Sequence, residues 1–461
     1  MPHIILLGTC DTKLEELLFT REKILKHKDT DVTLIDVGRT AVSDSAITVT
    51  TTELTSQYAP ESAPSNIGSL DRGELNKHMA ACATNYIRSS LKNQQNQSSD
   101  SETQSSNKPF TGIISMGGSG GTSLAAAVMR EALPMGFPKL IVSTIASGET
   151  GPIVGETDIT LMYSIVDIAG LNNILRIVIS NAAGAIVGMA NAYHQTIHDR
   201  PNPSAEPLHP QEQQQQDREG KKTPIRLGIT MFGVTTPAVT AIRAYLASLS
   251  ALPASQCPYA FPDTHIFHAT GHGGLAFERL LRARALDAAI DLTTTELADY
   301  LVAGANMSAG PTRLTAAPSL SIPSIVSLGA TDMANFGPIS SVPETYTKSG
   351  RRLYQHNPSV TLMRTSVEEC RKIGELVVEK LKGWEGDRGR CQVWIPKGGV
   401  SAMSVAGGPF EDREADDALF GAVREGLKGS GVEVVEDESD ITDEGFARAL
   451  VDALVAILRK Q

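Results

Sequence analysis

Short apolar runs alternate with amphipathic helical patterns through most of this chain, and this alternation constrains its fold more than any other feature. Runs without polar interruption indicate strands that are buried on both faces, and intervening helices are what parallel strands need as crossovers. The strand-like runs are HIILLGT, TLIDVG, GIISMGG, KLIVSTIAS, IRLGITMFG, HIFHAT, AAIDLT, SIPSIVSLG and RCQVWIP. The helical patterns cover residues 14–26, 76–87, 122–132, 237–248, 274–284 and 367–381. The sequence therefore predicts an α/β protein with doubly wound, mainly parallel sheets.

Two polar stretches divide the chain of 461 residues, which is too long for one compact core. Residues 194–223 are rich in Pro, Gln and charge, which is typical of a linker between domains. Residues 89–108 are a Ser- and Gln-rich insertion inside the first half. We predict an amino-terminal α/β domain over 1–193, a flexible linker over 194–223 and a carboxy-terminal α/β domain over 224–461.

Composition excludes several classes of protein. The 41 Lys and Arg residues against 52 Asp and Glu give a net charge of −11, which argues against general binding to nucleic acid or to anionic membranes. The five cysteines form no CxxC pair, so a reducing compartment fits best. The apolar start of the chain is too short for a membrane span and lacks the features of a signal peptide. We expect a cytosolic protein.

Ligands of such sheets bind beyond the carboxyl ends of the strands, where loops lead into helices. The segment GTCDTK follows the first strand, and its hydroxyl and carboxylate oxygens beside a helix start suit an anion or a ribose. A plain helix N-cap with no ligand explains the same residues. The motif alone does not separate these two interpretations.

The loop GGSGGTS follows the third strand and precedes an alanine-rich helix. No Lys-Ser or Lys-Thr pair follows its glycines, so it is not a Walker loop, and it is not a clean GxGxxG either. Four glycines in five positions exceed what a tight turn needs, and they let backbone approach a ligand closely. We predict that this loop faces the phosphates of a nucleotide.

Two more loops of small polar residues follow in the same half: SGET after the fourth strand, and the segment VDIAGLN. Convergence of several such loops at one sheet edge favours a shared ligand site. Glu149, Asp167 or Asp11 would be available there for Mg²⁺ or for ribose hydroxyls. No residue set for a separate protein-bound metal is assigned, because Mg²⁺ would bind through the nucleotide.

The second half also has polar loops between strand-like runs and helical patterns. These loops supply candidates for catalysis, namely His268, Asp291, Glu296 and Asp332. A metal site is the weaker alternative, because His265 and His268 would point to opposite faces of a strand and no HExxH pattern occurs. Acid–base chemistry by His268 with an acidic partner is chemically reasonable. A serine hydrolase is disfavoured because there is no GxSxG elbow.

Nine ordered segments carry a resemblance over nearly the whole chain: GTCDTK, GGSGGTSL, STIASGET, VDIAGLNNI, TMFGVTTP, FHATGHGG, DLTTTELAD, SLGATDMANFGP and HNPSVTLMRT. The chain resembles the ATP-binding domain family of the tomato mosaic virus resistance protein, with its uncharacterised bacterial and fungal members. The resemblance implies two Rossmann-like domains, ATP with Mg²⁺ in the first, and a homodimer. The chain departs from the family pattern at Cys10, where the family more often has alanine. His272 falls at a position that varies in the family, which favours His268 over His272 for a catalytic role.

Carried over by position, the resemblance and the loops imply one set of nucleotide-binding residues: Thr9, Cys10, Asp11, Thr12, Gly38, Arg39, Gly117, Gly118, Ser119, Gly120, Gly121, Thr122, Ser147, Gly148, Glu149, Thr150, Asp167, Gly170 and Asn172. We expect a cytosolic ATP-binding protein with a second small-molecule site around Gly233 to Pro237, His268 and Asp332. One alternative is an ATP-dependent transferase, or a hydrolase or lyase, that acts on a small carboxylate or sugar acid between the domains. Another is a regulatory or interaction protein that ATP orders.

Overall fold

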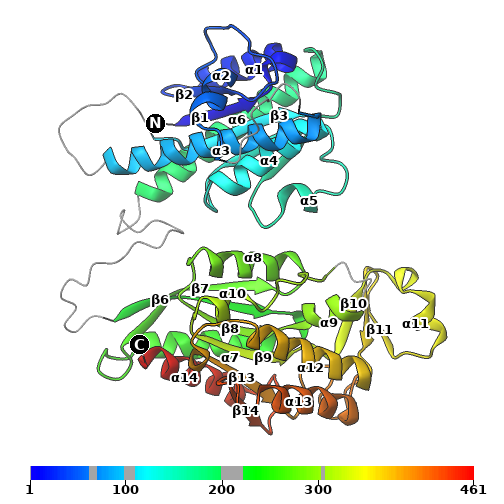
Figure 1. Ribbon diagram of the computed structural model, residues 1–461. Coiled ribbons are helices and arrows are strands. Elements are labelled where there is room, and N and C mark those ends of the chain that lie inside the picture. The colour runs from blue at the N-terminus through cyan, green and yellow to red at the C-terminus, as the bar shows by residue number, and fades with distance from the viewer. Residues whose placement is uncertain (1, 62–69, 98–108, 199–221, 303–306, 461) are drawn as a thin grey trace. The chain divides into compact units, whose positions relative to one another are not determined.

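The structure is a computed structural model that describes residues 2–61, 70–97, 109–198, 222–302 and 307–460 (Figure 1). The chain divides into two compact units, unit 1 (Met1–Pro207) and unit 2 (Leu208–Gln461). The division falls inside the predicted linker, of which residues 199–221 lie outside the described ones. Residues 98–108 of the predicted insertion lie outside them too.

Unit 1 contains a five-stranded parallel sheet with the strand order β2-β1-β3-β4-β5. In chain order its elements are β1 (His3–Gly8), α1 (Cys10–Leu25), β2 (Asp31–Asp36), α2 (Thr51–Gln57), α3 (Arg72–Gln97), β3 (Gly112–Gly117), α4 (Ser119–Ala132), β4 (Lys139–Ser143), α5 (Gly151–Val154), β5 (Thr160–Tyr163) and α6 (Asn173–His198).

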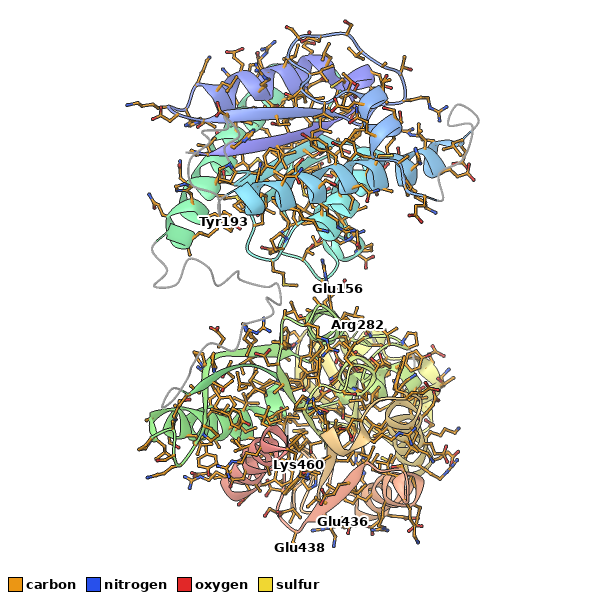
Figure 2. The ribbon with its side chains drawn as sticks, turned by 60° about the vertical axis from the view of Figure 1, so that its left-hand side comes forward. Glu156, Tyr193, Arg282, Glu436, Glu438 and Lys460 are labelled. Carbon is orange, nitrogen blue, oxygen red and sulfur yellow. The ribbon has the colours of Figure 1, made fainter. Side chains whose placement is uncertain are left out.

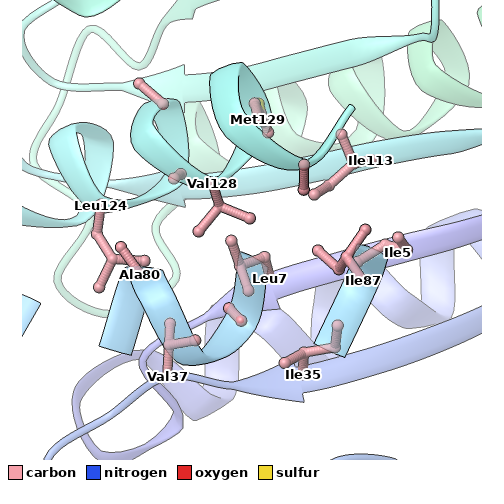
Figure 3. Close-up of a cluster of buried hydrophobic side chains, with 14 of the residues drawn as sticks. Ile5, Leu7, Ile35, Val37, Ala80, Ile87, Ile113, Leu124, Val128 and Met129 are labelled. Carbon is pink, nitrogen blue, oxygen red and sulfur yellow. The ribbon is translucent and has the colours of Figure 1, made fainter. Parts of the chain in front are cut away.

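Helices cover both faces of this sheet, and β1 shows why its sequence is apolar without interruption. Ile5 and Leu7 point into a core with α3 and α4, which Figure 3 shows in close-up. Ile4 and Leu6 point to the other face, into a core with α1 and α6. Each such side chain is buried, which stabilises the fold by about 1.5–3 kcal/mol per residue.

Two helices are longer than the polar composition of their ends suggests. The helix predicted over 76–87 is α3, which continues through Ser89–Gln97 of the predicted insertion. Its start is fixed by Asp71, which accepts a hydrogen bond from the Glu74 N–H, and Leu91 packs against the core of unit 1. The first five residues of the predicted linker belong to α6. Gln, Lys and Asn extend a helix that apolar contacts already hold, so polarity alone misplaces its end.

Unit 2 contains a six-stranded parallel sheet with the order β14-β13-β9-β8-β6-β7 and a small antiparallel sheet with the order β10-β12-β11. In chain order its elements are β6 (Thr223–Met231), η2 (Gly233–Thr235), α7 (Thr236–Ala251), β7 (Tyr259–His268), α8 (His272–Arg282), β8 (Ala288–Thr293), α9 (Thr295–Val302), α10 (Ala316–Ser319), β9 (Ser324–Gly329), β10 (Met333–Phe336), η3 (Ile339–Ser341), α11 (Glu344–Lys348), β11 (Leu353–Asn357), β12 (Val360–Arg364), α12 (Val367–Lys382), η4 (Arg388–Arg390), β13 (Cys391–Pro396), α13 (Arg413–Leu427), β14 (Glu433–Asp437) and α14 (Glu444–Arg459).

Both large sheets are wound in the same order, with the first strand of each unit next to its second and third strands. One face of the unit 2 sheet packs against α7 and α14, and the other packs against α12 and α13. The prediction of two Rossmann-like, mainly parallel α/β folds is confirmed. The antiparallel sheet is an addition that the sequence analysis did not foresee, because its strands have only four or five residues each.

One helix among the described residues, over Asn173–Ile197 of α6, is long and apolar enough to cross a bilayer. Leu175, Ile179 and Ile186 on its inner side are fully buried in unit 1. One side of α6 is therefore part of the core of unit 1.

Candidate functional site

The loops after β1 and β3 define the candidate site of unit 1. These strands are neighbours in the sheet, and the chain connects them to strands on opposite sides, which makes their carboxyl ends a topological switch point. Ligands of doubly wound sheets bind at this position. The two motifs that the sequence singled out therefore lie side by side.

The glycine loop turns directly from β3 into α4. A methyl group added at Gly117 would lie 3.0 Å from Cα of Gly121, so the turn needs a residue without a side chain there. Gly118 is the N-cap of α4 and offers no side-chain acceptor. The first backbone N–H of the turn to reach a carbonyl is that of Thr122, which donates to Gly118. The start of a helix leaves its first N–H groups unsatisfied, and these groups attract anions.

Thr122 has a different position from the rest of the loop. Its hydroxyl is buried, donates to the Gly117 carbonyl at 3.2 Å and is hydrogen-bonded to the Ser143 hydroxyl at 2.7 Å. Thr122 thus ties the glycine loop to the end of β4. The Thr122 hydroxyl is therefore fully engaged within the protein.

Two side chains of α3 lie over the glycine loop, and the sequence analysis did not select either. A methyl group at Gly120 would lie 3.2 Å from Nδ2 of Asn76 and 3.6 Å from Nη2 of Arg72. The guanidinium of Arg39, on the loop after β2, donates to the carbonyl of Leu70, which lies just before the start of α3, at 3.1 Å. An amide and an exposed guanidinium therefore add donors above the α4 N-terminus. No local motif marks them, because α3 is distant in sequence from the loop.

The turn after β1 is built around Asp11. Its Oδ2 accepts hydrogen bonds from the N–H groups of Arg39 at 2.8 Å and Thr40 at 3.1 Å. A methyl group at Gly38 would lie 2.6 Å from Oδ1 of Asp11, so this contact requires glycine. Asp11 thus clamps the loop after β2. Thr9 and Thr12 remain at the surface of the turn, where their hydroxyls hydrogen-bond to each other at 2.8 Å.

Cys10 lies beneath the same turn and beside the buried carboxylate of Asp36. Oδ1 of Asp36 accepts the N–H groups of Cys10 and Gly38, each at 2.9 Å. Burial raises the pKa of the Cys10 thiol far above its ordinary value, and the negative charge of Asp36 acts in the same direction. Cys10 is therefore a neutral buried thiol, and its N–H is already bonded within the protein.

The loops after β4 and β5 carry the remaining predicted residues. Ser147, Gly148 and Glu149 are exposed, whereas Thr150 is half-buried. Asn172 caps α6, because its Oδ1 accepts the Leu175 N–H at 2.9 Å.

Next to that cap, the N–H of Gly170, which has φ +82°, donates to Glu16 at 2.7 Å. Asp167 is exposed, and its Oδ1 accepts the N–H of Ile168. Glu149 and Asp167 are therefore the predicted carboxylates of these loops that face solvent.

In unit 2, a buried arginine organises the predicted acidic residues. Arg313 is fully buried and donates to Asp291 at 2.5 and 2.6 Å and to Glu296 at 2.6 Å. Glu278 completes the cluster, because it accepts the N–H of Leu314 at 2.6 Å. Burial raises the pKa of Glu296 and of Glu278, while the Arg313 charge opposes that shift. Asp291 and Glu296 both have a structural partner.

The glycine-rich loop after β7 encloses a carboxylate of the protein itself. Oε1 of Glu296 accepts the N–H groups of Gly271 at 2.6 Å and Gly274 at 3.1 Å. A methyl group at Gly274 would lie 2.1 Å from Oε2 of Glu296. This loop resembles an anion site in sequence because an internal anion occupies it.

His268 and Asp332 differ sharply in exposure. His268 is exposed, its Nδ1 is hydrogen-bonded to the Thr270 hydroxyl at 3.2 Å, and its ring stands edge-on to Phe232. Asp332 is fully buried, and its Oδ2 accepts the Ser401 hydroxyl at 2.7 Å. Burial raises the pKa of Asp332. Within the described residues, no hydrogen bond joins His268 to any of the three predicted acids.

Metal ligands do not gather in the part of the chain that the structure describes: no group of three or more His, Cys, Asp or Glu side chains there could hold an ion. All five cysteines, which fall within that part, are free thiols.

The chain has two α/β units, each built on a parallel sheet, with small polar loops at a topological switch point. These features place it among two-domain Rossmann-like proteins. The chain belongs to the uncharacterised protein family UPF0261, whose N-terminal domain matches residues 2–195 and whose C-terminal domain matches residues 224–458. A UPF0261 protein of Clostridium tetani is 37% identical over 99% of both chains. Another, of Mesorhizobium japonicum, is 38% identical over 98% of both chains.

The resemblance to the tomato protein is confirmed. The ToMV resistance protein Tm-1(GCR237) of Solanum lycopersicum is 33% identical over all of this chain, which corresponds to 56% of that protein. Among solved structures, a UDP-N-acetylglucosamine 2-epimerase from Rickettsia bellii matches 70% of this chain and 78% of its own, at 9% identity and a TM-score of 0.21. A similarity of that size carries no argument about function.

Proposed function

We propose that this protein binds ATP together with Mg²⁺ at the carboxyl edge of the unit 1 sheet. The phosphates would lie over residues Gly118–Gly121 at the N-terminus of α4, where Ser119 is exposed and the three glycines are half-buried. The observation that carries the proposal is the convergence of that glycine-rich helix start with Arg72 and Asn76 at a topological switch point.

Charge supports the same placement. Arg72 supplies a positive charge that adds to the partial positive charge of the α4 N-terminus. Asp11 and Asp36 each accept backbone N–H groups with one carboxylate oxygen, whereas Oδ1 of Asp11 and Oδ2 of Asp36 are buried and accept no hydrogen bond from the described residues. Glu149 and Asp167 are the exposed carboxylates that would hold Mg²⁺ or its bound water.

Calorimetric titration of the full chain with ATP and Mg²⁺ tests the proposal. We expect Arg72→Ala to weaken ATP binding about tenfold, because one charge-assisted hydrogen bond is worth about 1.5–3 kcal/mol and solvent weakens an exposed one. The matched control is Lys77→Ala, which removes an exposed charge from the same helix. No heat at millimolar ATP in the wild type would end the proposal. Equal affinities of the two variants would remove Arg72 from the site.

Gly118 offers a second variant that should keep the fold. A methyl group there meets only the Thr144 hydroxyl, at the ordinary distance of 3.7 Å. A leucine at this position would project its side chain over the first turn of α4. We expect Gly118→Leu to abolish ATP binding while the protein stays folded, with a loss of stability of about 1 kcal/mol because leucine is a poorer N-cap than glycine. Retained binding would place the nucleotide elsewhere.

A cytosolic location belongs to the same proposal, because the nucleotide and reduced thiols coexist there. A second small-molecule site in unit 2 stays a prediction. Of its predicted residues, Gly233 and His268 are exposed, whereas Asp332 is buried under the segment that carries Ser401. An ATP-dependent reaction also stays a prediction, and product formation from ATP with small carboxylates or sugar acids is its test.

A further inference from the structure

Lys13 is the basic residue of the segment GTCDTK, and its ammonium group has no ionic partner. The side chain is half-buried in the turn that follows β1. Its Nζ donates a hydrogen bond to the carbonyl of Ile168. In the part of the chain that the structure describes, no carboxylate forms an ion pair with it. A partly buried charge without a counterion is costly unless a ligand supplies the opposite charge.

The backbone of α1 has a kink at Lys13. This residue has φ −139° and ψ 30°, which are not helical values, so the turn Cys10–Thr12 is set apart from the rest of α1. The Lys13 side chain reaches the loop after β5, and it contacts a carbonyl that lies 155 residues further along the chain. The kink therefore brings an ammonium group to the carboxyl edge of the sheet.

The loop after β5 crosses that edge to reach Lys13. It begins beside β4, where the N–H of Ser164 donates to the Ser143 carbonyl at 3.1 Å. It arrives beside α1, where the N–H of Gly170 donates to Glu16 at 2.7 Å. Because β3 lies between β4 and β1 in the sheet, the loop passes the end of β3, from which the glycine loop starts. Lys13 therefore stands beside the glycine loop.

The carbonyl that holds the ammonium group is itself fixed. Ile168 and Leu175 are fully buried in the core that α1 and α6 share. The far end of α6 is fixed as well, because Tyr193, which Figure 2 labels, packs edge-on against Phe137. An ammonium group has three N–H donors, and within the described residues only the Ile168 carbonyl accepts from it. Two positioned donors therefore remain for a ligand.

Lys13 and Arg72 flank the glycine loop from opposite faces of the sheet. The helix α1, which carries Lys13, packs on the same face as α6. The helix α3, which carries Arg72, packs on the other face with α4 (Figure 1). Two cations that approach from two faces suit a ligand whose negative charge is spread along a chain, and they suit a single small anion less well.

We propose that Lys13 is a phosphate-binding residue and that the site selects nucleotides with a polyphosphate chain. The glycine loop after β3 contains no lysine, and the loop after the neighbouring strand β1 supplies one instead. Lys13 binds the phosphate chain from the α1 side, and Arg72 binds it from the α3 side. This inference rests on the proposed nucleotide site. AMP, which lacks the chain, is expected to bind about tenfold more weakly than ATP or worse, because it loses a charge-assisted contact.

Calorimetric titration of the full chain with ATP and, separately, with inorganic tripolyphosphate tests the role of Lys13. The variant Lys13→Gln keeps a donor for the Ile168 carbonyl and removes the charge. We expect it to weaken binding of both ligands about tenfold and to make the ATP affinity less dependent on salt, because one charge contact is lost. A purely structural lysine would leave the salt dependence unchanged. Lys13→Arg, which keeps the charge, is expected to retain more affinity than Lys13→Gln.

The matched control is Lys23→Gln, near the other end of α1. Lys23 is also half-buried, and its ammonium group lies over the ring of Phe19, 4.7 Å from the ring centroid. This change should leave both affinities as they are. If Lys13→Gln fails to fold, acetylation of the wild type followed by mass spectrometry decides the question, because tripolyphosphate should protect Lys13 and not Lys23.

The outcomes separate this inference from the nucleotide site on which it rests. Unchanged ATP affinity and salt dependence in Lys13→Gln, or no protection of Lys13, would overturn the role of Lys13 and leave the nucleotide site standing. AMP that binds as tightly as ATP would overturn the selection for a polyphosphate chain. A wild type that binds tripolyphosphate but not ATP would end the nucleotide proposal, and one that binds neither would end both.

Discussion

At the scale of single residues, Glu296 acts as an internal ligand. It accepts two N–H groups of the loop after β7 and one N–H of Arg313, so it joins three segments of unit 2. Replacing one member of such a buried ionic cluster is far more costly than breaking a surface ion pair. The sequence predicts Asp291 and Glu296 as candidates for catalysis, but their contacts with Arg313 give them a structural role.

Asp299 is the residue whose titration should measurably change the unfolding free energy of the protein with pH. It is buried, and its carboxylate accepts the N–H and the side-chain amide of Asn335. Burial raises its pKa to about 7, while the hydrogen bonds from Asn335 oppose that rise. Because the folded state binds the proton more tightly than the unfolded state, this group stabilises unit 2 at low pH. That contribution is lost as pH rises from about 4 to about 7.

Asp299→Asn should remove this pH dependence. In the wild type, Oδ1 of Asn335 accepts no hydrogen bond. The amide introduced at position 299 can donate to this oxygen after the side-chain amide of Asn335 flips by half a turn. Urea unfolding between pH 4 and pH 8 measures the effect. We expect the unfolding free energy of the variant to depend less on pH, by up to roughly 1.4 kcal/mol per unit within that window. Asp416, with a pKa of about 6 from burial, titrates in both proteins and so cancels in the comparison. Equal slopes in both proteins would contradict the assignment.

At the scale of elements, the turn from β7 into α8 should tolerate no side chain at Gly274. A methyl group would overlap the Glu296 carboxylate, and the cluster around Arg313 prevents that carboxylate from moving away. We expect Gly274→Ala to destabilise unit 2 by about 3 kcal/mol or more, the upper end of what overpacking costs. Chemical denaturation measures this loss of stability. Gly421→Ala is the matched control, because Gly421 also lies in a helix but has space around it for a methyl group. Gly310→Ala would be a less suitable control, because Gly310 has φ +69°. A loss under about 1 kcal/mol would show that Glu296 is not held in place.

Element boundaries were predictable where apolar periodicity ends at glycine and less so elsewhere. The strand before Gly117 and the helix after Gly118 follow directly from the sequence, because only glycine fits so tight a turn. The ends of α3 and α6 do not, since contacts such as that of Leu91 with the core extend them into polar sequence. Arg72 and Asn76 were missed for a related reason, because only the packing of α3 beside α4 brings them to the loop.

At the scale of the whole molecule, two units with separate cores should unfold separately. Each unit has its own hydrophobic clusters, and the division falls in the polar stretch 194–223. Differential scanning calorimetry should therefore resolve two transitions. ATP with Mg²⁺ should raise only the transition of unit 1, by about 2.7 kcal/mol of stabilisation at a concentration 100 times the dissociation constant.

A fragment of residues 1–198 serves as the control that assigns the transitions. One cooperative transition for the full chain, or a nucleotide shift in the transition that this fragment lacks, would contradict the assignment of the site to unit 1.

The sequence by itself determined the α/β class, the parallel winding and the order of the loops, because apolar period and glycine position act locally along the chain. Only the tertiary structure decided which polar groups are free to meet a ligand. Arg313 meets Glu296 across 17 residues and Asp291 across 22, and Arg72 reaches Gly120 from another helix. The partner of a charge is set by packing, and packing depends on contacts between segments that are far apart in the sequence.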